Sequence, residues 1–301
     1  MTIKTLIVVV GPTASGKTAL AIRLAQQLQT EIISGDARQF YAEMNIGTAR
    51  PTQREMQLIP HHLVGHISIN QPYNAGLFET EAQNLLTHLF QQHNQVILVG
   101  GSGMYIKALC EGFDILPDVP DNIRDELNQT YIQNGLSKLQ QMLAKLDPAY
   151  YKQVDLNNPQ RIIRALEICK VTKQPYSSFR KGLKAIRDYR IIKIGLDLPR
   201  EELYLRINNR VEEMMQGGLL QEVEQLFPSK TLNALKTVGY TELFDYLDQR
   251  ITLPRAIELI KQNTRHYAKR QMTWFNKDPE IRWFNPNDWQ QILHYLQTEL
   301  S

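Results

Sequence analysis

The chain of 301 residues is poor in cysteine, in net charge and in long apolar runs. Its two cysteines, Cys110 and Cys169, lie far apart, which excludes a disulfide framework or a cysteine zinc site and suits a reducing cytoplasm. No apolar run approaches the roughly 20 residues of a membrane-spanning helix, and no signal-peptide pattern is visible. We therefore expect a cytoplasmic protein without a membrane partner. Because the net charge is only +3, any nucleic-acid surface must be a local patch.

Strand and helix patterns alternate in the first third of the chain. Strands are predicted at 5–10 (TLIVVV), 31–34 and 94–101, and helices at 16–28 and 102–112. Continuous apolar strands separated by helices indicate a parallel sheet covered on both faces. Beyond residue 189, a strand is predicted at 190–199, helices at 200–218, 219–227, 240–249 and 254–275, and a short strand at 280–284.

The pattern changes at FDILPDVPDN (113–122), where prolines and aspartates interrupt the alternation. From 121 to about 180 the sequence carries only helical signals. We therefore expect an α/β fold whose parallel sheet core, residues 1–112 and 190–301, is flanked by helices and carries an all-helical insertion domain at 113–189.

Basic residues are concentrated in this insertion. Residues 160–190 contain nine Lys or Arg against two acidic residues, with Tyr176, Phe179 and Tyr189 among them. Most charged runs are solvated helix faces, but basic residues interleaved with aromatics suit a phosphate backbone with unstacked bases. A second basic cluster with aromatics is RHYAKRQMTW (265–274). The two clusters together favour a nucleic-acid partner.

Residues 11–18, GPTASGKT, follow the first strand and precede the first helix, as a P-loop does. Its glycines permit a tight turn whose amides converge on phosphate oxygens, and Lys17 adds a positive charge. The hydroxyl of Thr18 can bind Mg²⁺. The core is therefore predicted to be a P-loop parallel sheet that binds phosphate groups.

The acid that P-loop enzymes using ATP normally place after a strand is missing. Such an Asp helps to hold Mg²⁺, but the strand VILVGG (96–101) ends in two glycines. The acid that follows an early strand is Asp36, which could bind an acceptor or be the N-cap of a helix.

Arginines and histidines each allow two interpretations. Arg206 and Arg210 share one helix face and, with Arg200, could clamp a phosphate or instead pair with Glu202 and Glu213. The histidines of IPHHLVGH (59–66) lack an accompanying cysteine or carboxylate cluster, so we do not assign them to a zinc site.

Eight motifs occur in a fixed order that is specific to one family. They are GPTASGKTALA, IISGDARQFYAEMNIGTARP, PHHLVG, VGGSGMYIKAL, NPQRIIRALE, RVEEMMQGGLLQEV, TVGYTELFDYL and AKRQMTWF. From about residue 6 to about residue 275, the chain resembles the bacterial tRNA dimethylallyltransferase family, also called tRNA isopentenyltransferases.

The resemblance implies the reaction and its partners. A dimethylallyl group would pass from dimethylallyl diphosphate to the exocyclic amine of the adenosine 3′-adjacent to the anticodon, in tRNAs reading codons that begin with U. The P-loop would hold the diphosphate, which accounts for the missing acid because no γ-phosphate is transferred. The resemblance also implies Mg²⁺ on Thr18, a monomer, and an insertion domain that grips the anticodon stem-loop.

Roles follow from the resemblance position by position. Asp36 would be the general base, Arg210 would bind the leaving diphosphate and Thr13 would join them as a catalytic residue. The diphosphate would lie on Gly11, Pro12, Thr13, Ala14, Ser15, Gly16, Lys17 and Thr18. The tRNA would contact Asp36, Ala37, Arg38, Gln39, Ser102, Arg124, Gln160, Arg161, Ile162, Ile163, Arg164, Lys236, Thr237, Val238, Gly239, Tyr240 and Thr241.

Two positions depart from the family pattern. Ala37 stands where Ser is common, which removes one hydrogen bond near the adenine, and Thr241 stands where Arg or Lys is frequent, which weakens a phosphate contact. Three alternatives remain: prenylation of free adenine nucleotides, a P-loop small-molecule kinase, and an RNA-binding P-loop module that uses nucleotide as a switch. The basic insertion and QRIIR favour tRNA, because a free nucleotide would not need them.

Overall fold

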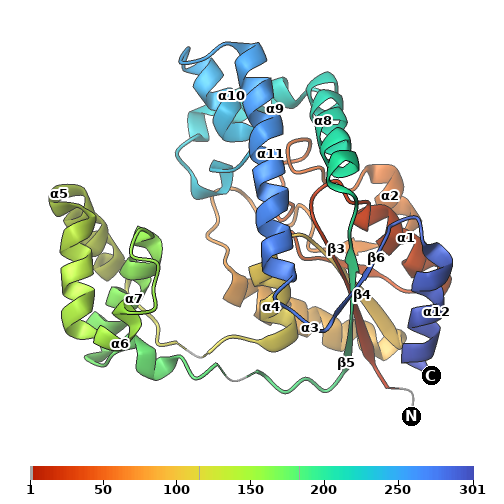
Figure 1. The fold of residues 1–301 in the computed structure, drawn as a ribbon, viewed down its shortest axis with the longest axis horizontal. Helices are drawn as coiled ribbons and strands as arrows, with labels where there is room; N and C mark the ends of the chain where they lie inside the picture. The colour runs from red at the N-terminus through yellow and green to blue at the C-terminus, as the bar shows by residue number, and fades with distance from the viewer. Residues whose placement is uncertain (1–2, 115, 183) are drawn as a thin grey trace. The chain divides into compact units, whose positions relative to one another are not determined.

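The computed structural model describes residues 3–114, 116–182 and 184–301, and its fold is drawn in Figure 1. The chain forms two units. One consists of Met1–Glu111 with Ile186–Ser301, and the other of Gly112–Ala185.

A parallel sheet forms the centre of the first unit (Figure 1). Within the described residues it has six strands in the order β3-β2-β4-β1-β5-β6, all parallel. The strands are β1 Thr5–Val10, β2 Ile32–Ser34, β3 His61–His62, β4 Gln95–Val99, β5 Arg190–Leu196 and β6 Ile281–Phe284. The central strand β1 is buried at every position, as its unbroken apolar sequence predicts. The predicted parallel α/β core is confirmed.

Helices cover both faces of the sheet because successive side chains of β1 point to opposite sides. Leu6 and Val8 pack with residues of α3 (Ala75–Gln92) and α4 (Gly103–Glu111). Ile7 and Val9 pack with α1 (Lys17–Leu28) and with α12 (Trp289–Leu300). The order of the strands places β1 and β2 on either side of β4, so the loops that follow them lie at one edge of the sheet.

A third core lies among the helices after β5 and is centred on Tyr240. These elements are α8 Arg200–Gln216, α9 Leu219–Leu226, α10 Tyr240–Leu247 and α11 Leu253–Phe275, with 3₁₀ helices at Phe227–Ser229 and Asn233–Leu235. The four α-helices agree with the predicted ranges to within two residues. The sequence did not predict β3, α3, α12 or the short helix α2 (Gln53–Leu58).

The second unit is helical, as predicted. It contains α5 (Asp121–Leu146, interrupted at Gly135), α6 (Pro148–Tyr151), α7 (Pro159–Thr172) and a 3₁₀ helix at Tyr176–Phe179. Leucines of α5 and isoleucines of α7 form its core. Among the described residues of the whole chain, every helix is too short or too polar to span a bilayer.

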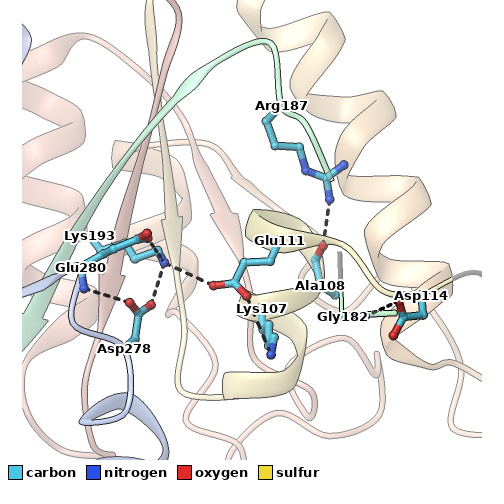
Figure 2. Close-up of polar contacts among 9 residues, drawn as sticks. All are labelled: Lys107, Ala108, Glu111, Asp114, Gly182, Arg187, Lys193, Asp278 and Glu280. Atoms are coloured by element: carbon cyan, nitrogen blue, oxygen red, sulfur yellow. Dashed lines mark hydrogen bonds and ion pairs between the residues drawn. The ribbon is translucent and has the colours of Figure 1, made fainter. Parts of the chain in front are cut away.

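Polar contacts fix the chain where it leaves and re-enters the first unit (Figure 2). In that unit, Arg187 donates to the carbonyl oxygen of Ala108 at 3.0 Å and pairs with Glu79 at 2.7 Å. In the helical unit, the carboxylate of Asp114 accepts from the amides of Lys181 and Gly182 at 3.1 and 2.9 Å. The two ends of the helical unit are therefore tied to each other.

Lys193 is a buried cation on β5 that is surrounded by carboxylates (Figure 2). Its Nζ lies 2.6 Å from Asp278, 2.7 Å from Glu280 and 3.8 Å from Glu111, and the side chain is only 5% exposed. Burial lowers the pKa of Lys193, but hydrogen bonds to Asp278 and Glu280 outweigh this and raise the pKa above its usual value. Lys193 therefore neutralises carboxylates brought together by α4 and the segment before β6.

Replacement of Lys193 should be costly to stability. Lys193→Met removes the buried cation that Asp278, Glu280 and Glu111 share and is expected to lower the free energy of unfolding by about 3 kcal/mol. Lys107→Met is the matched control, because Lys107 also lies 3.8 Å from Glu111 but is half exposed. The control should cost less than about 1 kcal/mol. Urea unfolding followed by circular dichroism measures both, and equal losses would contradict the assignment.

Candidate active site

The loop between β1 and α1, residues 11–18, is shaped to hold an anion. Gly11 has a φ of +147°, and a Cβ there would lie 2.7 Å from the carbonyl oxygen of Leu196, so the position requires glycine. Ala14 and Gly16 also have positive φ, which helps neighbouring amides turn toward one side of the loop. Gly16 caps α1 without a side-chain hydrogen bond, so the first amides of the helix can face a ligand.

The hydroxyl of Ser15 is buried in this loop and lacks a hydrogen-bond partner among the described residues. Leaving such a group unpaired costs about 1–3 kcal/mol. A phosphate oxygen in the loop would accept this hydrogen bond. Ser15 is therefore suited to the phosphate-binding role predicted for it.

Lys17 is a half-buried residue at the start of α1. Its Nζ donates to the carbonyl oxygen of Pro12 at 2.6 Å. Burial lowers the pKa of Lys17 to about 7, and the charge of Arg210 contributes, while the charge of Asp36 opposes the shift. An anion in the loop would reverse this shift because it favours the ammonium form.

Asp36 follows β2, at the same edge of the sheet as the P-loop. Its Oδ1 accepts from the amide of Arg38 at 3.0 Å, so Asp36 stabilises a turn and not the start of a helix, which was the alternative considered from the sequence. Its carboxylate is close enough for its charge to act on Lys17, Arg210 and Tyr267. The structure therefore brings the predicted base and the predicted phosphate-binding groups together.

The two arginines of α8 have different partners. Arg210 donates to the hydroxyl of Thr13 at 3.3 Å, and burial lowers its pKa although the guanidinium stays charged. Arg206 instead pairs with Glu202 at 2.8 Å. The phosphate-binding interpretation therefore fits Arg210, and the salt-bridge interpretation describes Arg206.

Two residues of α11 belong to this site although the sequence analysis gave them no role. Gln271 accepts from the amide of Thr13 at 2.8 Å and donates to the carbonyl oxygen of Gly101 at 2.9 Å. Burial raises the pKa of Tyr267 to about 12, to which the charge of Asp36 adds, while a hydrogen bond with Ser102 opposes it. No local pattern in the sequence singles out either residue, because their partners lie far away in the chain.

The residues next to Asp36 that are predicted to contact RNA already form hydrogen bonds within the protein. Ala37 donates its amide to Ser102 Oγ at 2.8 Å, although its methyl group offers no hydroxyl to a base. The guanidinium of Arg38 donates to the carbonyl oxygens of Asn233, Ala234 and Lys236 at 3.0 to 3.4 Å. Gln39 donates to the carbonyl oxygens of Thr48 and Ala49. Arg38 thus joins the loop after β2 to the start of the predicted RNA segment 236–241.

Only some residues of segment 236–241 are exposed to solvent. Lys236 and Thr241 are exposed, Thr237 and Val238 are half-buried, and Gly239 and Tyr240 are buried. Tyr240 donates to Glu222 at 2.6 Å. The same carboxylate accepts from the amides of residues 45–47 at 2.7 to 3.0 Å. Glu222 therefore connects the side chain of Tyr240, within the predicted RNA segment 236–241, to the backbone of residues 45–47.

The predicted RNA residues of the helical unit divide into surface and core. Gln160 and Arg161 are exposed at the start of α7, whereas Ile162 and Ile163 are buried and have no side-chain surface to offer a partner. Arg124 and Arg164 both pair with the buried carboxylate of Glu167. Glu167 thus holds two partly exposed guanidinium groups in fixed positions on this unit.

A shallow basic pocket of about 360 Å³ lies on α11. It is lined by His266, Lys269, Arg270, Thr273, Trp274 and Lys277, within and just beyond the second basic cluster of the sequence. Trp274 rests against Gly103, where a Cβ would lie 2.2 Å from the indole ring. A cationic surface with an exposed aromatic ring suits an unstacked base and its phosphate.

The histidines near β3 have protein partners. His62 pairs with Glu31 at 2.5 Å, His66 with Glu81 at 3.3 Å, and His61 Nδ1 lies 2.8 Å from the carbonyl oxygen of Ile59. Among the described residues, no three His, Cys, Asp or Glu side chains come together as a metal site.

Comparisons with known proteins agree with this geometry. A family model described as IPP transferase matches residues 39–278. The chain is 50% identical to tRNA dimethylallyltransferase 1 of Bacteroides fragilis over 301 residues, the full length of both. The crystal structure of a tRNA isopentenylpyrophosphate transferase from Bacillus halodurans superposes with a TM-score of 0.73 at 35% identity, covering 99% of this chain and 97% of that one. A eukaryotic dimethylallyltransferase acting on tRNA gives a TM-score of 0.80 at 27% identity, covering 96% and 75%.

Binding of pyrophosphate at pH 8 should be accompanied by proton uptake. With a pKa of about 7, most Lys17 is neutral at this pH, and an anion in the loop draws it back to the ammonium form. Affinity should therefore fall as the pH rises above 7. Calorimetry in buffers of different ionisation enthalpy measures the uptake. Lys17→Arg, which stays charged, is the control, and equal uptake by both proteins would contradict the role of Lys17.

Proposed function

The chain belongs to the IPP transferase family of tRNA dimethylallyltransferases, and on that premise we propose the reaction that it catalyses. It transfers a dimethylallyl group from dimethylallyl diphosphate to the exocyclic amine of the adenosine 3′-adjacent to the anticodon. The acceptors are tRNAs that read codons beginning with U, and diphosphate is released. The observation that carries the proposal is the meeting of Lys17, Arg210 and Asp36 at one edge of the sheet.

The donor's diphosphate lies in the P-loop. When the allylic C–O bond breaks, both electrons of the bond stay with the diphosphate oxygen, and negative charge develops there. Lys17, Arg210 and the first amides of α1 are preorganised to stabilise this charge, and Ser15 donates its hydroxyl hydrogen bond. Thr13 orients Arg210 toward the loop.

Asp36 acts as the general base. The lone pair of an adenine amine is delocalised, so the amine must lose a proton as its nitrogen bonds to the allylic carbon. A carboxylate within hydrogen-bond reach accepts that proton. The bond from the amide of Arg38 to Oδ1 holds the carboxylate in one orientation.

Mg²⁺ is the divalent cation that we propose for this site. The half-buried hydroxyl of Thr18, directly after Lys17 at the start of α1, fits an ion shared with diphosphate oxygens. Bound there, the ion would neutralise part of the diphosphate charge.

The tRNA contacts both units. The basic residues of the helical unit, residues 113–189 as predicted from the sequence, bind the anticodon stem-loop, with Arg124, Gln160, Arg161 and Arg164 at its surface. The target adenine is flipped from the loop toward Asp36 and Ser102. We also propose that the protein acts as a monomer. We propose the cytoplasm as its location because the proposed substrate is tRNA. The relatives' names do not favour the free-nucleotide or kinase alternatives.

Replacement of the base should separate chemistry from binding. Asp36→Asn removes the proton acceptor at constant size and should lower kcat by about 10²- to 10⁴-fold with little change in the Kd for tRNA. Transfer of labelled dimethylallyl groups to an anticodon stem-loop measures the rate, with AMP and ATP as alternative substrates in parallel.

The stem-loop should be labelled and AMP should not. Labelling of AMP alone, or ATP turnover without prenyl transfer, would overturn the proposed reaction. A loss of tRNA affinity without a change in kcat would overturn the role of Asp36.

Charge reversal on the helical unit should change the salt dependence of tRNA binding. Arg161→Glu removes one phosphate contact and is expected to reduce the slope of log K against log [salt] by about 1. Lys138→Glu makes the same charge change at another exposed position of this unit and should have a smaller effect. Filter binding at several salt concentrations provides the slopes. Identical slopes for both variants would remove Arg161 from the interface.

A further inference from the structure

The side chain of Gln271 is buried, and both ends of its amide are used. Only 5% of the residue is exposed, Oε1 accepts from the amide of Thr13 and Nε2 donates to the carbonyl oxygen of Gly101. A flipped amide would set N–H against N–H and oxygen against oxygen, so the orientation is fixed by its partners. Gln271 therefore presents a permanent acceptor to the P-loop.

By accepting from the amide of Thr13, Gln271 takes up a hydrogen-bond donor in the first half of the P-loop. Pro12 has no N–H, and its carbonyl oxygen accepts from Lys17 at 2.6 Å and from the amide of Ser15 at 3.3 Å. The amide of Thr13 is committed to Gln271, and its hydroxyl accepts from Arg210. Neither Pro12 nor Thr13 therefore offers an amide to a phosphate, and the amide of Ser15 is bonded to Pro12. The donors left for a phosphate include the hydroxyl of Ser15, Lys17 and the first amides of α1.

A chain of three phosphates needs a longer row of donors than a chain of two. In P-loops that bind nucleoside triphosphates, the loop amides surround the α- and β-phosphates and the lysine reaches the β- and γ-phosphates. Here the lysine, Arg210 and the second half of the loop can serve two phosphates, whereas in the first half Pro12 has no N–H and the amide of Thr13 is bonded to Gln271.

We propose that Gln271 is a specificity-determining residue that restricts this P-loop to diphosphates and discriminates against nucleoside triphosphates. The inference rests on the proposed function, in which the donor carries a diphosphate. Specificity of this kind is a difference between two affinities, and it is obtained by denying the competitor a partner. ATP would otherwise occupy the loop and exclude the prenyl donor.

The test compares pyrophosphate with tripolyphosphate in the presence of Mg²⁺. Calorimetry gives the ratio of their dissociation constants for the wild-type protein, Gln271→Met and Gln262→Met. Gln271→Met keeps the length of the side chain, loses the strong acceptor and frees the amide of Thr13, so the preference for pyrophosphate should shrink about tenfold. Gln262→Met makes the same change at an exposed position of α11 and should leave the ratio as it is.

A second variant and a wild-type measurement cover the case in which Gln271→Met fails to fold. Gln271→Glu keeps an oxygen acceptor for Thr13, so it should weaken both ligands through its charge while the ratio stays near the wild-type value. In the wild-type enzyme, pyrophosphate should compete with dimethylallyl diphosphate at least about tenfold more tightly than tripolyphosphate does.

Three results would overturn the inference: equal inhibition of the wild type by the two ligands, an unchanged ratio in folded Gln271→Met, or a collapsed ratio in Gln271→Glu. Prenyl transfer to tRNA is measured on the same wild-type preparation. Transfer together with any of these results rejects the specificity role alone, whereas absence of transfer and of pyrophosphate binding rejects the proposed function.

Discussion

The partial burial of two cations beside one carboxylate is the constraint on which this site depends. Burial lowers the pKa of Lys17 to about 7, the charge of Arg210 contributes to this shift, and the charge of Asp36 offsets these effects only in part. Such an arrangement persists only if rigid elements hold it. Leu203 and Ile207 of α8 pack with Ala268 of α11 and with Ala14 of the loop, which holds both cations in place. A polyanionic ligand relieves the repulsion that folding leaves behind, so stability is exchanged for affinity.

Helix α11 connects the parts of the site. Its Tyr267 and Gln271 face Asp36, Ser102 and the P-loop, and its Trp274, which lines the basic pocket, packs against the neighbouring Gly103. Two further residues connect the loop after β2 to the later helices. Arg38 of this loop donates to the carbonyl oxygen of Ala234, which follows α9, and Glu222 of α9 accepts from the amide of Ile46. The P-loop, Asp36 and the basic pocket on α11 therefore all belong to the first unit.

Local patterns predicted the P-loop, the buried strands and most helices, because strand, turn and helix there are adjacent in sequence. They could not separate Arg206 from Arg210, which share a helix face and differ only in what lies opposite. The pairing of Gln271 with Thr13 spans most of the chain and leaves no local trace. The two-residue strand β3 is too short to show the alternation of side chains that identifies a strand. Nothing in the sequence indicates that Glu167 is buried between two arginines.

The helical unit leaves the core after α4 and returns just before β5. A parallel crossover between β4 and β5 needs a helix, and α4 already supplies one, so the sheet can form without the unit. Asp114 draws the two ends of the unit together, as the ends of an inserted domain usually lie. The unit is a side branch that evolution can lengthen, shorten or resurface without changing the register of a single strand. A change in the length or surface of this unit would therefore leave the strands and the P-loop of the first unit in place.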